Sequence, residues 1–403
     1  MDIRSLMNQN FRDIEGGLFS RESGKADVGD VAARIAEMGA ANMAWADPFY
    51  PDPSTPPHVL RAAVEELERG TTSHYTAPIG NMELKKAIAK KLKSYNGLDA
   101  DPLRNIIITP GSDAGLLFAM MPFISPGDEI MVPDPSYPSN FLNPRLLGGV
   151  TVPVPLEKAN GYQPDIQEFK KRLTPKTKMI LISHPNNPTA TVFRRNALEA
   201  LCQFIVENDL VLVCDQAFED MIYDGIEFVT PASLPHMFER TVTTFSVSKG
   251  MGLSGFRIGY NVACDRVMDV FHGSAVNVVG ASNTAAQTAV LEAFRDNSFL
   301  KDYTEKLDKR RKAVYKIFSN TPGVVLKPAE SGFLSWLDIS AIGESGEIVQ
   351  HLIEHARVLV NDGSFYGAQG RGHIRVVHGC FWEDEQALDA CMRISAALAD
   401  KLI

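Results

Sequence analysis

The chain has 403 residues, of which 45% are hydrophobic and 22% are charged, and its formal net charge is −9 at pH 7. The length suits a large α/β domain with a second, smaller one, and the composition excludes disordered and fibrous proteins. The acidic balance offers no attraction to phosphate backbones or anionic lipids, so we expect neither nucleic acid nor a membrane as a partner.

The N-terminal stretch and the cysteines are typical of a cytoplasmic protein. Residues 1–17, MDIRSLMNQNFRDIEGG, have neither the basic flank nor the continuous apolar stretch of a signal peptide. No later apolar run approaches the length that spans a membrane. The five cysteines are scattered, with no C-x-x-C pair and no histidine at metal spacing. We therefore expect buried thiols and no metal site.

Short runs rich in Ile and Val recur from about residue 105 to 265, which predicts a mostly parallel sheet buried on both faces. The runs are NIIIT (105–109), EIMVP (129–133), KMILIS (178–183), LVLVCD (210–215), TVTTFS (241–246) and RIGYNVA (257–263). Each of the first five ends in a polar cluster, in order PGSD, DPSYPSN, HPNNPT, DQAF and VSKG. Ligands of open α/β sheets bind beyond the carboxyl ends of the strands, so we expect these clusters to converge on one crevice.

The C-terminal part predicts a small α+β domain. Residues 298–320 have apolar positions at helical spacing opposite a charged face, which predicts a long surface helix. Two strand-like and two helical stretches follow, which are GFLSWLD (332–338), HIRVVHG (373–379), GEIVQHLIEHA (346–356) and DEQALDACMRISAALADKL (384–402). We expect a large domain over residues 51–295 and a small domain formed by residues 1–50 and 296–403.

Three glycines, Gly250, Gly252 and Gly255, have the spacing of the G-x-G-x-x-G dinucleotide fingerprint. The context does not fit an NAD site, because a strand-like stretch follows where the fingerprint requires a helix. Lys249, directly before the glycines, lies immediately beyond a buried strand. A lysine there can be desolvated and its pKa lowered, which suits Schiff-base chemistry. The alternative is that Lys249 is an ordinary solvated lysine in a loop. The four other polar clusters at the strand ends favour the functional role.

The stretch SVSKGMGLSGFRIGY, residues 246–260, resembles the S-x-S-K-x-x-x-x-x-G-x-R signature of fold-type I pyridoxal 5'-phosphate (PLP) enzymes, specifically the class I/II aminotransferases. The resemblance extends from PPHVLRAA to GHIRVVHG, in the order of the family's motifs. It implies a large domain with a mostly parallel sheet flanked by helices, plus a small α+β domain. The implied reaction moves an amino group from an L-amino acid to a 2-oxo acid, through pyridoxamine phosphate.

Two other readings stay open. The same scaffold supports several reactions of PLP, and a carbon–sulfur β-lyase is the main alternative to transamination. A regulatory homologue without catalysis is the second, and the presence of Lys249, Asp215 and Arg375 speaks against it.

The resemblance implies the residues that hold the cofactor ring. Lys249 would bind PLP as a Schiff base and shuttle the proton at the substrate Cα. Asp215 would keep the pyridine nitrogen protonated, and Asn187 would donate to O3', although N-N-P-T is also a good turn. Tyr137 would stack on the ring. Phe218 occupies the place of a tyrosine that also donates to O3', so we expect Phe218→Tyr to lower the pKa of the Schiff base.

The phosphate requires donors and positive charge. Backbone N–H groups at a strand-to-helix junction would bind it, together with side chains that flank the lysine. By the resemblance, the phosphate ligands are Gly111, Ser112, Asp113, Ser246, Ser248 and Arg257. Ser112 or Asp113 would also cap the helix. Tyr75, in HYTAPIGNMELKKAIA, matches a tyrosine that reaches the phosphate of the neighbouring subunit, which implies a homodimer with shared active sites.

For the substrate, Arg375 corresponds to the arginine that grips the α-carboxylate, bidentately as its planar fork allows. Asn187 and Trp45 are the other expected substrate contacts. Several residues depart from the family's pattern, namely Ala44, Ala46, Asn140 and Ala190. Asn140 alters the expected support for Asp215. The amino donor stays open, with Arg4, Arg21 and Lys25 as candidates for a second positive group by location alone.

Overall fold

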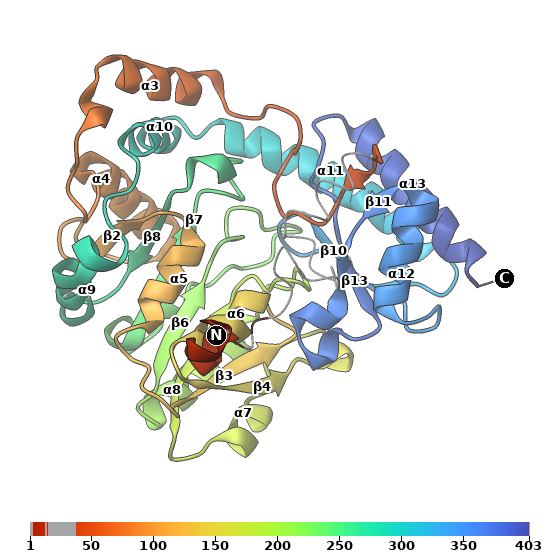
Figure 1. Cartoon of the computed structure of the whole chain (residues 1–403), viewed down its shortest axis with the longest axis horizontal. Coiled ribbons are helices and arrows are strands. Elements are labelled where there is room, and N and C mark those ends of the chain that lie inside the picture. The colour runs from red at the N-terminus through yellow and green to blue at the C-terminus, as the bar shows by residue number, and fades with distance from the viewer. Residues whose placement is uncertain (1–2, 13, 15–37, 403) are drawn as a thin grey trace.

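The computed structural model describes residues 3–12, 14 and 38–402. Its centre is a seven-stranded sheet in the order β2-β8-β7-β6-β5-β3-β4 (Figure 1). The strands are β2 (Ile106–Thr109), β3 (Glu129–Asp134), β4 (Val150–Pro155), β5 (Thr177–Ser183), β6 (Val211–Asp215), β7 (Thr241–Ser246) and β8 (Gly259–Val262). Strands β3 to β7 pair in parallel, and β8 is antiparallel to both β2 and β7. The prediction of a mostly parallel sheet is confirmed.

All six predicted runs form strands of this sheet, and β4 is the strand of the seven-stranded sheet that the sequence did not predict. Its sequence, VTVPVP, carries Pro153 and Pro155, and proline cannot donate a hydrogen bond to the neighbouring strand. The edge position of β4, beside β3 alone, tolerates both prolines.

Both faces of the sheet are buried, as the continuous apolar runs require. Along β5, Met179 and Leu181 pack in one core while Ile180 and Ile182 pack in another, because successive side chains of a strand point to opposite faces. Helices α5 (Ser112–Met120) and α9 (Asp265–Val278) cover the first core. The remaining helices of this part are α3 (Pro57–Glu68), α4 (Met82–Lys91), α6 (Pro138–Leu146), α7 (Ile166–Arg172), α8 (Arg195–Glu207) and α10 (Thr284–Arg295).

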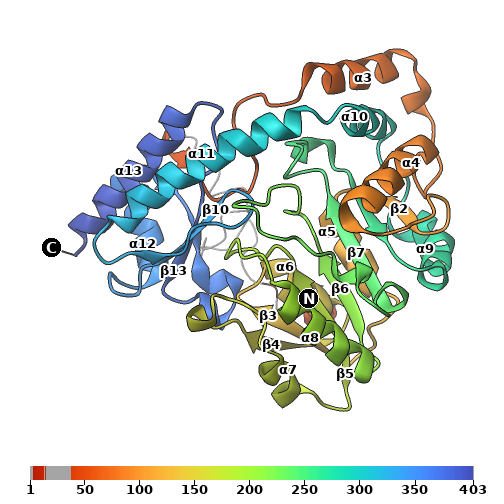
Figure 2. The ribbon, with the colours of Figure 1, turned by 180° about the vertical axis from the view of Figure 1, so that it is seen from behind.

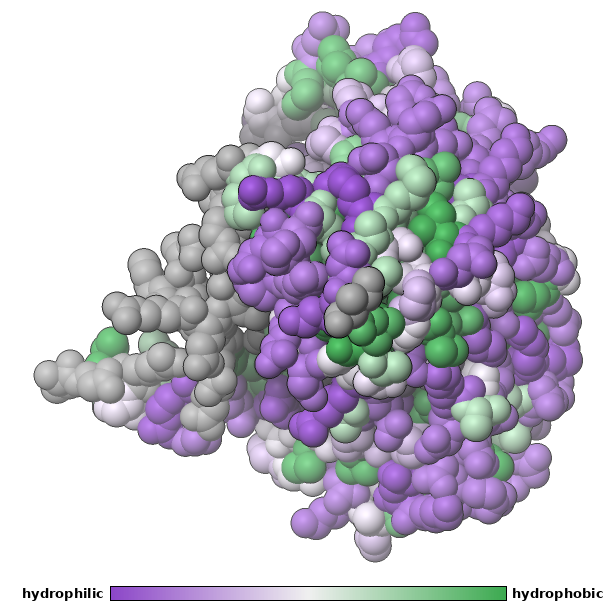
Figure 3. Space-filling model, turned by 90° about the vertical axis from the view of Figure 1, so that its right-hand side faces the viewer, coloured by the Kyte–Doolittle hydropathy of each residue, from purple (hydrophilic) through white to green (hydrophobic). Residues whose placement is uncertain are grey.

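A second, smaller sheet lies in the C-terminal part, shown in blue in Figure 1. It has the antiparallel order β12-β13-β10-β9. Its strands are β9 (Val325–Leu326), β10 (Leu334–Asp338), β12 (Asn361–Asp362) and β13 (His373–Val377). The helices are α11 (Phe299–Ser319), α12 (Ser345–His351) and α13 (Asp384–Asp400), and α11 runs from the large sheet to the small one (Figure 2). The face over this part is mostly hydrophilic, with small scattered hydrophobic patches (Figure 3).

The described residues of the N-terminal segment 1–50, which we expected in the small domain, contact both parts of the structure. Strand β1 (Ala41–Asn42) pairs with β11 (Val358–Leu359), as that prediction requires. Helix α1 (Gln9–Arg12) instead lies against α6 of the large part. The boundaries of the two domains stay a prediction. Among the described residues, no helix is both long and apolar enough to cross a membrane.

Candidate active site

The carboxyl ends of the strands surround a cavity of about 280 Å³. Each of the five predicted polar clusters contributes to its lining, so the predicted convergence is confirmed. The sequence-predicted residues that line it are Trp45, Ser112, Asp113, Tyr137, Asn187, Asp215, Phe218, Ser248, Lys249, Arg257 and Arg375. Arg375 comes from β13 of the small sheet, so the cavity lies between the two parts.

Lys249 follows β7 and lies half-buried in this cavity. Its Nζ donates a hydrogen bond to the backbone oxygen of Ala46, at 2.6 Å. Burial lowers the pKa of Lys249, and the positive charges of Arg375 and Arg257 act in the same direction. The carboxylates of Asp113 and Asp47 oppose this shift. The amine is therefore closer to its neutral, nucleophilic form than a solvated lysine.

Asp215 ends β6 and is buried at the floor of the cavity. Its two oxygens accept hydrogen bonds from the Ser183 hydroxyl and from the backbone N–H of Ala217, both at 3.1 Å. Burial raises the pKa of Asp215 to about 6, and the negative charge of Asp113 adds to this effect. A positively charged partner therefore stabilises the ionised form of this buried carboxylate.

Asn140 supports Asp215 indirectly. Its Nδ2 donates to the hydroxyls of Ser136 and Ser183, at 2.9 and 3.0 Å, and all of these side chains are buried. Ser183 in turn donates to Asp215. The sequence could not reveal this chain, because Ser183 ends β5 and Asn140 lies on α6, and their contact depends on how the helix docks on the sheet.

Arg375 is buried and held on three sides. Its Nη2 donates to the Ala44 backbone oxygen at 2.7 Å and to Asn361 Oδ1 at 2.6 Å. Its Nη1 donates to Asn187 Oδ1 at 2.9 Å. The guanidinium also lies over the ring of Tyr366, 5.0 Å from its centroid. These contacts fix the plane of the fork, and they bring the predicted substrate residues Arg375 and Asn187 together.

The corner around Gly111 forms an anion cradle. Gly111 has φ 88°, and a Cβ at this position would lie 2.4 Å from Nη2 of Arg257. No side chain caps the N-terminus of α5, which begins at Ser112. The first N–H groups of a helix have no partner within it, and its dipole favours negative charge there. Asp113 carries an opposing negative charge, 3.8 Å from Arg257.

Three aromatic rings line the cavity. The hydroxyl of Tyr137 donates to Asp113 Oδ1 at 3.2 Å, so the ring has a fixed position. Phe218 is buried against Phe333, with ring centroids 5.5 Å apart. Trp45 packs against Tyr50, with centroids 5.4 Å apart.

Three predicted cofactor residues do not line this cavity: Gly111, at the corner described above, Ser246 and Tyr75. Ser246 Oγ accepts a hydrogen bond from the backbone N–H of Ser248, and Ser246 lines a different cavity. Tyr75 is fully exposed on the surface. Arg21, Lys25 and the side chain of Arg4 lie outside the described residues.

Asp47 and Ser254 also line the cavity, and sequence reasoning missed both. The Ser254 hydroxyl donates to Asp47 Oδ1 at 2.6 Å, and the Ser254 backbone oxygen accepts from Arg257 at 2.9 Å. Neither residue belongs to a polar cluster at a strand end, so no pattern marked them. Within the described part of the chain, no group of three or more His, Cys, Asp or Glu side chains could hold a metal ion.

Comparison with known proteins identifies the family. Residues 42–394 match the family model "Aminotransferase class I and II". The chain is 33% identical over 349 residues to aromatic-amino-acid aminotransferase 2 of Thermococcus litoralis, which covers 85% of this chain and 89% of that protein. It is also 33% identical, with the same coverage, to an aspartate aminotransferase of Pyrococcus abyssi.

Solved structures agree with the family model. The aromatic aminotransferase of Pyrococcus horikoshii superposes with a TM-score of 0.85 and 30% identity, over 92% of this chain and 100% of that one. A single mutant of Thermus thermophilus aspartate aminotransferase gives a TM-score of 0.86 with 27% identity, over 97% of this chain and 99% of that one. The chain therefore belongs to the class I and II aminotransferases, enzymes that transfer an amino group.

Proposed function

We propose that this enzyme uses PLP to move the amino group of an L-amino acid to a 2-oxo acid, with Lys249 as the residue that binds the cofactor covalently. The observation that carries this proposal is the arrangement of one half-buried amine, one buried carboxylate and one buried guanidinium around a single cavity, beside an uncapped helix N-terminus. When bound, PLP supplies the electron-withdrawing ring that stabilises a carbanion at the substrate Cα.

The residues present fit PLP at both ends of the molecule. The cradle of Gly111, the N-terminus of α5 and Arg257 suits a phosphate, because donors and positive charge meet there. Asp215 suits the protonated pyridine nitrogen, because a buried carboxylate gains most from a positive partner. Asn187 Oδ1 accepts from Arg375, which leaves Nδ2 to donate to the phenolic oxygen. Tyr137 and Phe218 add apolar ring surface.

Lys249 has the second role of moving a proton. Its lowered pKa favours the neutral amine, which would accept and later return the proton at the substrate Cα. Arg375 binds the substrate α-carboxylate and fixes which Cα bond faces Lys249. To do so, its fork has to exchange part of its present contacts with Asn187 and Asn361.

The test is an assay of the holoenzyme with an amino acid and a 2-oxo acid together, with all products measured. We expect a new amino acid, derived from the 2-oxo acid, in amounts equal to the donor consumed, and no ammonia. Release of ammonia with a 2-oxo acid product, without a new amino acid, would instead indicate lyase chemistry. Among the common amino acids, the donor consumed fastest then identifies the substrate.

We further propose that the active enzyme is a homodimer that shares its active sites. Tyr75 is fully exposed, and the outer face of α3 carries the exposed apolar side chains Leu60, Val64 and Leu67. An apolar helix face of this kind favours a second copy of the chain. The hydroxyl of Tyr75 would then reach the phosphate in the other subunit. The cytoplasmic location stays a prediction, which cell fractionation tests.

A further inference from the structure

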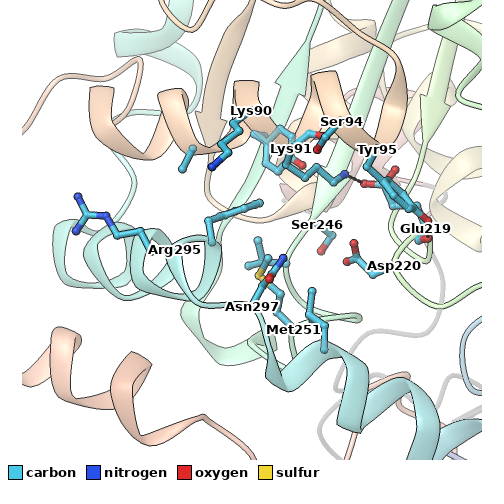
Figure 4. Close-up of a pocket in the computed structure, with 15 residues that line it drawn as sticks. Lys90, Lys91, Ser94, Tyr95, Glu219, Asp220, Ser246, Met251, Arg295 and Asn297 are labelled. Carbon is cyan, nitrogen blue, oxygen red and sulfur yellow. Dashed lines mark hydrogen bonds and ion pairs between the residues drawn. The ribbon is translucent and has the colours of Figure 1, made fainter.

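A second cavity, of about 510 Å³, lies behind the lysine segment 246–251 (Figure 4). Ser246, Val247 and Met251 form part of its lining, whereas Ser248 and Lys249 line the active-site cavity. The two cavities share no lining residue. The rest of the second cavity comes from α4, the turn that follows it at 92–96, the end of α10 and the beginning of α11. Its volume is in the range of small-molecule sites.

Two adjacent carboxylates reach this cavity, and the first of them is fully paired. Glu219 is buried and forms an ion pair with Lys91. It also accepts hydrogen bonds from Asn96 Nδ2 at 2.6 Å and from Gln216 Nε2 at 2.8 Å. Three donors therefore contact the Glu219 carboxylate, and the Lys91 ammonium is paired with it.

Asp220 is the second of these two carboxylates. Among the described residues, its carboxylate has no hydrogen bond or ion pair of its own, and Figure 4 shows it turned towards the cavity. It is only partly exposed and lies against the lysine segment, since a Cβ on Gly250 would be 2.2 Å from its Oδ2. Burial raises the pKa of Asp220, and the charge of Lys91 opposes the shift. Its oxygens are not fully buried, so a ligand in the cavity can reach them.

The other charges of the lining do not neutralise Asp220. Lys90 and Arg295 lie at the far side of the cavity in Figure 4, and Arg295 is paired with Glu292 at 2.5 Å. The lining also includes the apolar side chains of Met251, Phe294 and Leu300, together with polar Ser94 and Asn297. The end of the cavity at Asp220 thus carries two carboxylates against the single positive charge of Lys91, whereas Lys90 and Arg295 lie at the opposite end.

We propose that this second cavity binds a small organic cation, an ammonium or guanidinium group on a short apolar chain, with Asp220 as its ionic partner. The Ser246 hydroxyl lies beside Asp220 and supplies a further acceptor (Figure 4). The apolar chain packs on Met251, Phe294 and Leu300. This site is separate from the amino-group transfer and does not depend on it.

The probe for the test is n-butylguanidinium, which does not form a Schiff base with the cofactor. Calorimetric titration of the holoenzyme should give saturable binding of one molecule per chain. Asp220→Asn, which keeps the shape of the side chain and removes its charge, should weaken binding at least about tenfold, because a charge-assisted contact is lost. Asp269→Asn is the matched control, because Asp269 is an exposed carboxylate on α9. It should bind like the wild type.

Pentanoate, an anion of similar length, separates charge recognition from simple filling of an apolar space. We expect it not to bind. The proposal is wrong if n-butylguanidinium shows no saturable binding, if Asp220→Asn binds it as tightly as the wild type, or if pentanoate binds equally well.

Discussion

Asp215 is buried in a place where its charge is needed only when the cofactor is bound. In the protein without PLP, burial raises its pKa from 3.8 to about 6. The folded state then holds this proton more tightly than the unfolded state, so stability is lost as the pH rises from about 4 through about 6. We predict that Asp215→Asn makes the cofactor-free protein about 3 kcal/mol more stable at pH 7.5, with no gain below pH 4.

The same substitution should abolish most of the activity, because an asparagine cannot hold the pyridine nitrogen in its protonated form. Denaturant unfolding of the cofactor-free proteins at pH 7.5 and pH 3.8 measures the first effect, and the transamination assay measures the second. Equal stability of wild type and variant at pH 7.5 would contradict the pKa assigned to Asp215.

Asn140 acts through Ser183, so it is a positioning residue. In Asn140→Ala the Ser183 hydroxyl loses the donor that orients it towards Asp215, and the pKa of Asp215 should rise further. PLP binding should weaken about tenfold at pH 7, and its dependence on pH should move to higher pH. Asn143→Ala, one turn later on α6, is the control. A variant that loses affinity equally at every pH would show a merely structural role.

At the scale of elements, the junction of β2 and α5 forms the phosphate cradle, and it requires glycine for two reasons. Gly111 has positive φ, and a Cβ there would meet Arg257. Gly127→Ala provides the matched control, because Gly127 has the same φ, 89° against 88°, with nothing within 4 Å of a Cβ. Both variants should lose about 1 kcal/mol of stability from backbone strain.

Only Gly111→Ala should also displace Arg257 and weaken PLP binding, by about tenfold or more, since a charged phosphate contact is disturbed. Fluorescence titration with PLP measures the affinity of both variants. If Gly111→Ala binds PLP as tightly as Gly127→Ala does, the phosphate does not lie in this cradle.

Elements with strong apolar runs could be predicted from the sequence, and so could the meeting of the polar clusters, because strand direction alone brings carboxyl ends together. Strand β4 could not, since its prolines hide the pattern. The position of Ser246 could not be predicted for a different reason. Ser246 and Ser248 are two residues apart, which on a strand places both side chains on one side, but β7 ends at Ser246 and the two residues line different cavities. The contacts of Asn140 and Asn361 depend on docking between elements far apart in the chain.

At the scale of the whole molecule, shared active sites predict that two inactive variants restore each other. Lys249→Ala lacks the reactive amine and Tyr75→Ala lacks the proposed phosphate contact, and each alone should be strongly impaired. In a mixed dimer, one site combines an intact Lys249 with Tyr75 of the partner subunit. A reassociated equal mixture should therefore regain about a quarter of the wild-type activity per site. If the mixture is no more active than the better variant alone, Tyr75 does not act across an interface.

The most direct test of the account is the absorption spectrum of the purified protein with PLP during addition of a single amino acid, without any 2-oxo acid. We predict that the band of lysine-bound PLP gives way to that of the amino form of the cofactor, and that a 2-oxo acid then restores it. Lys249→Ala should lack the starting band. If the wild-type protein shows no such band, or if the band persists while ammonia and a 2-oxo acid accumulate, the role of Lys249 or the transfer of the amino group is contradicted.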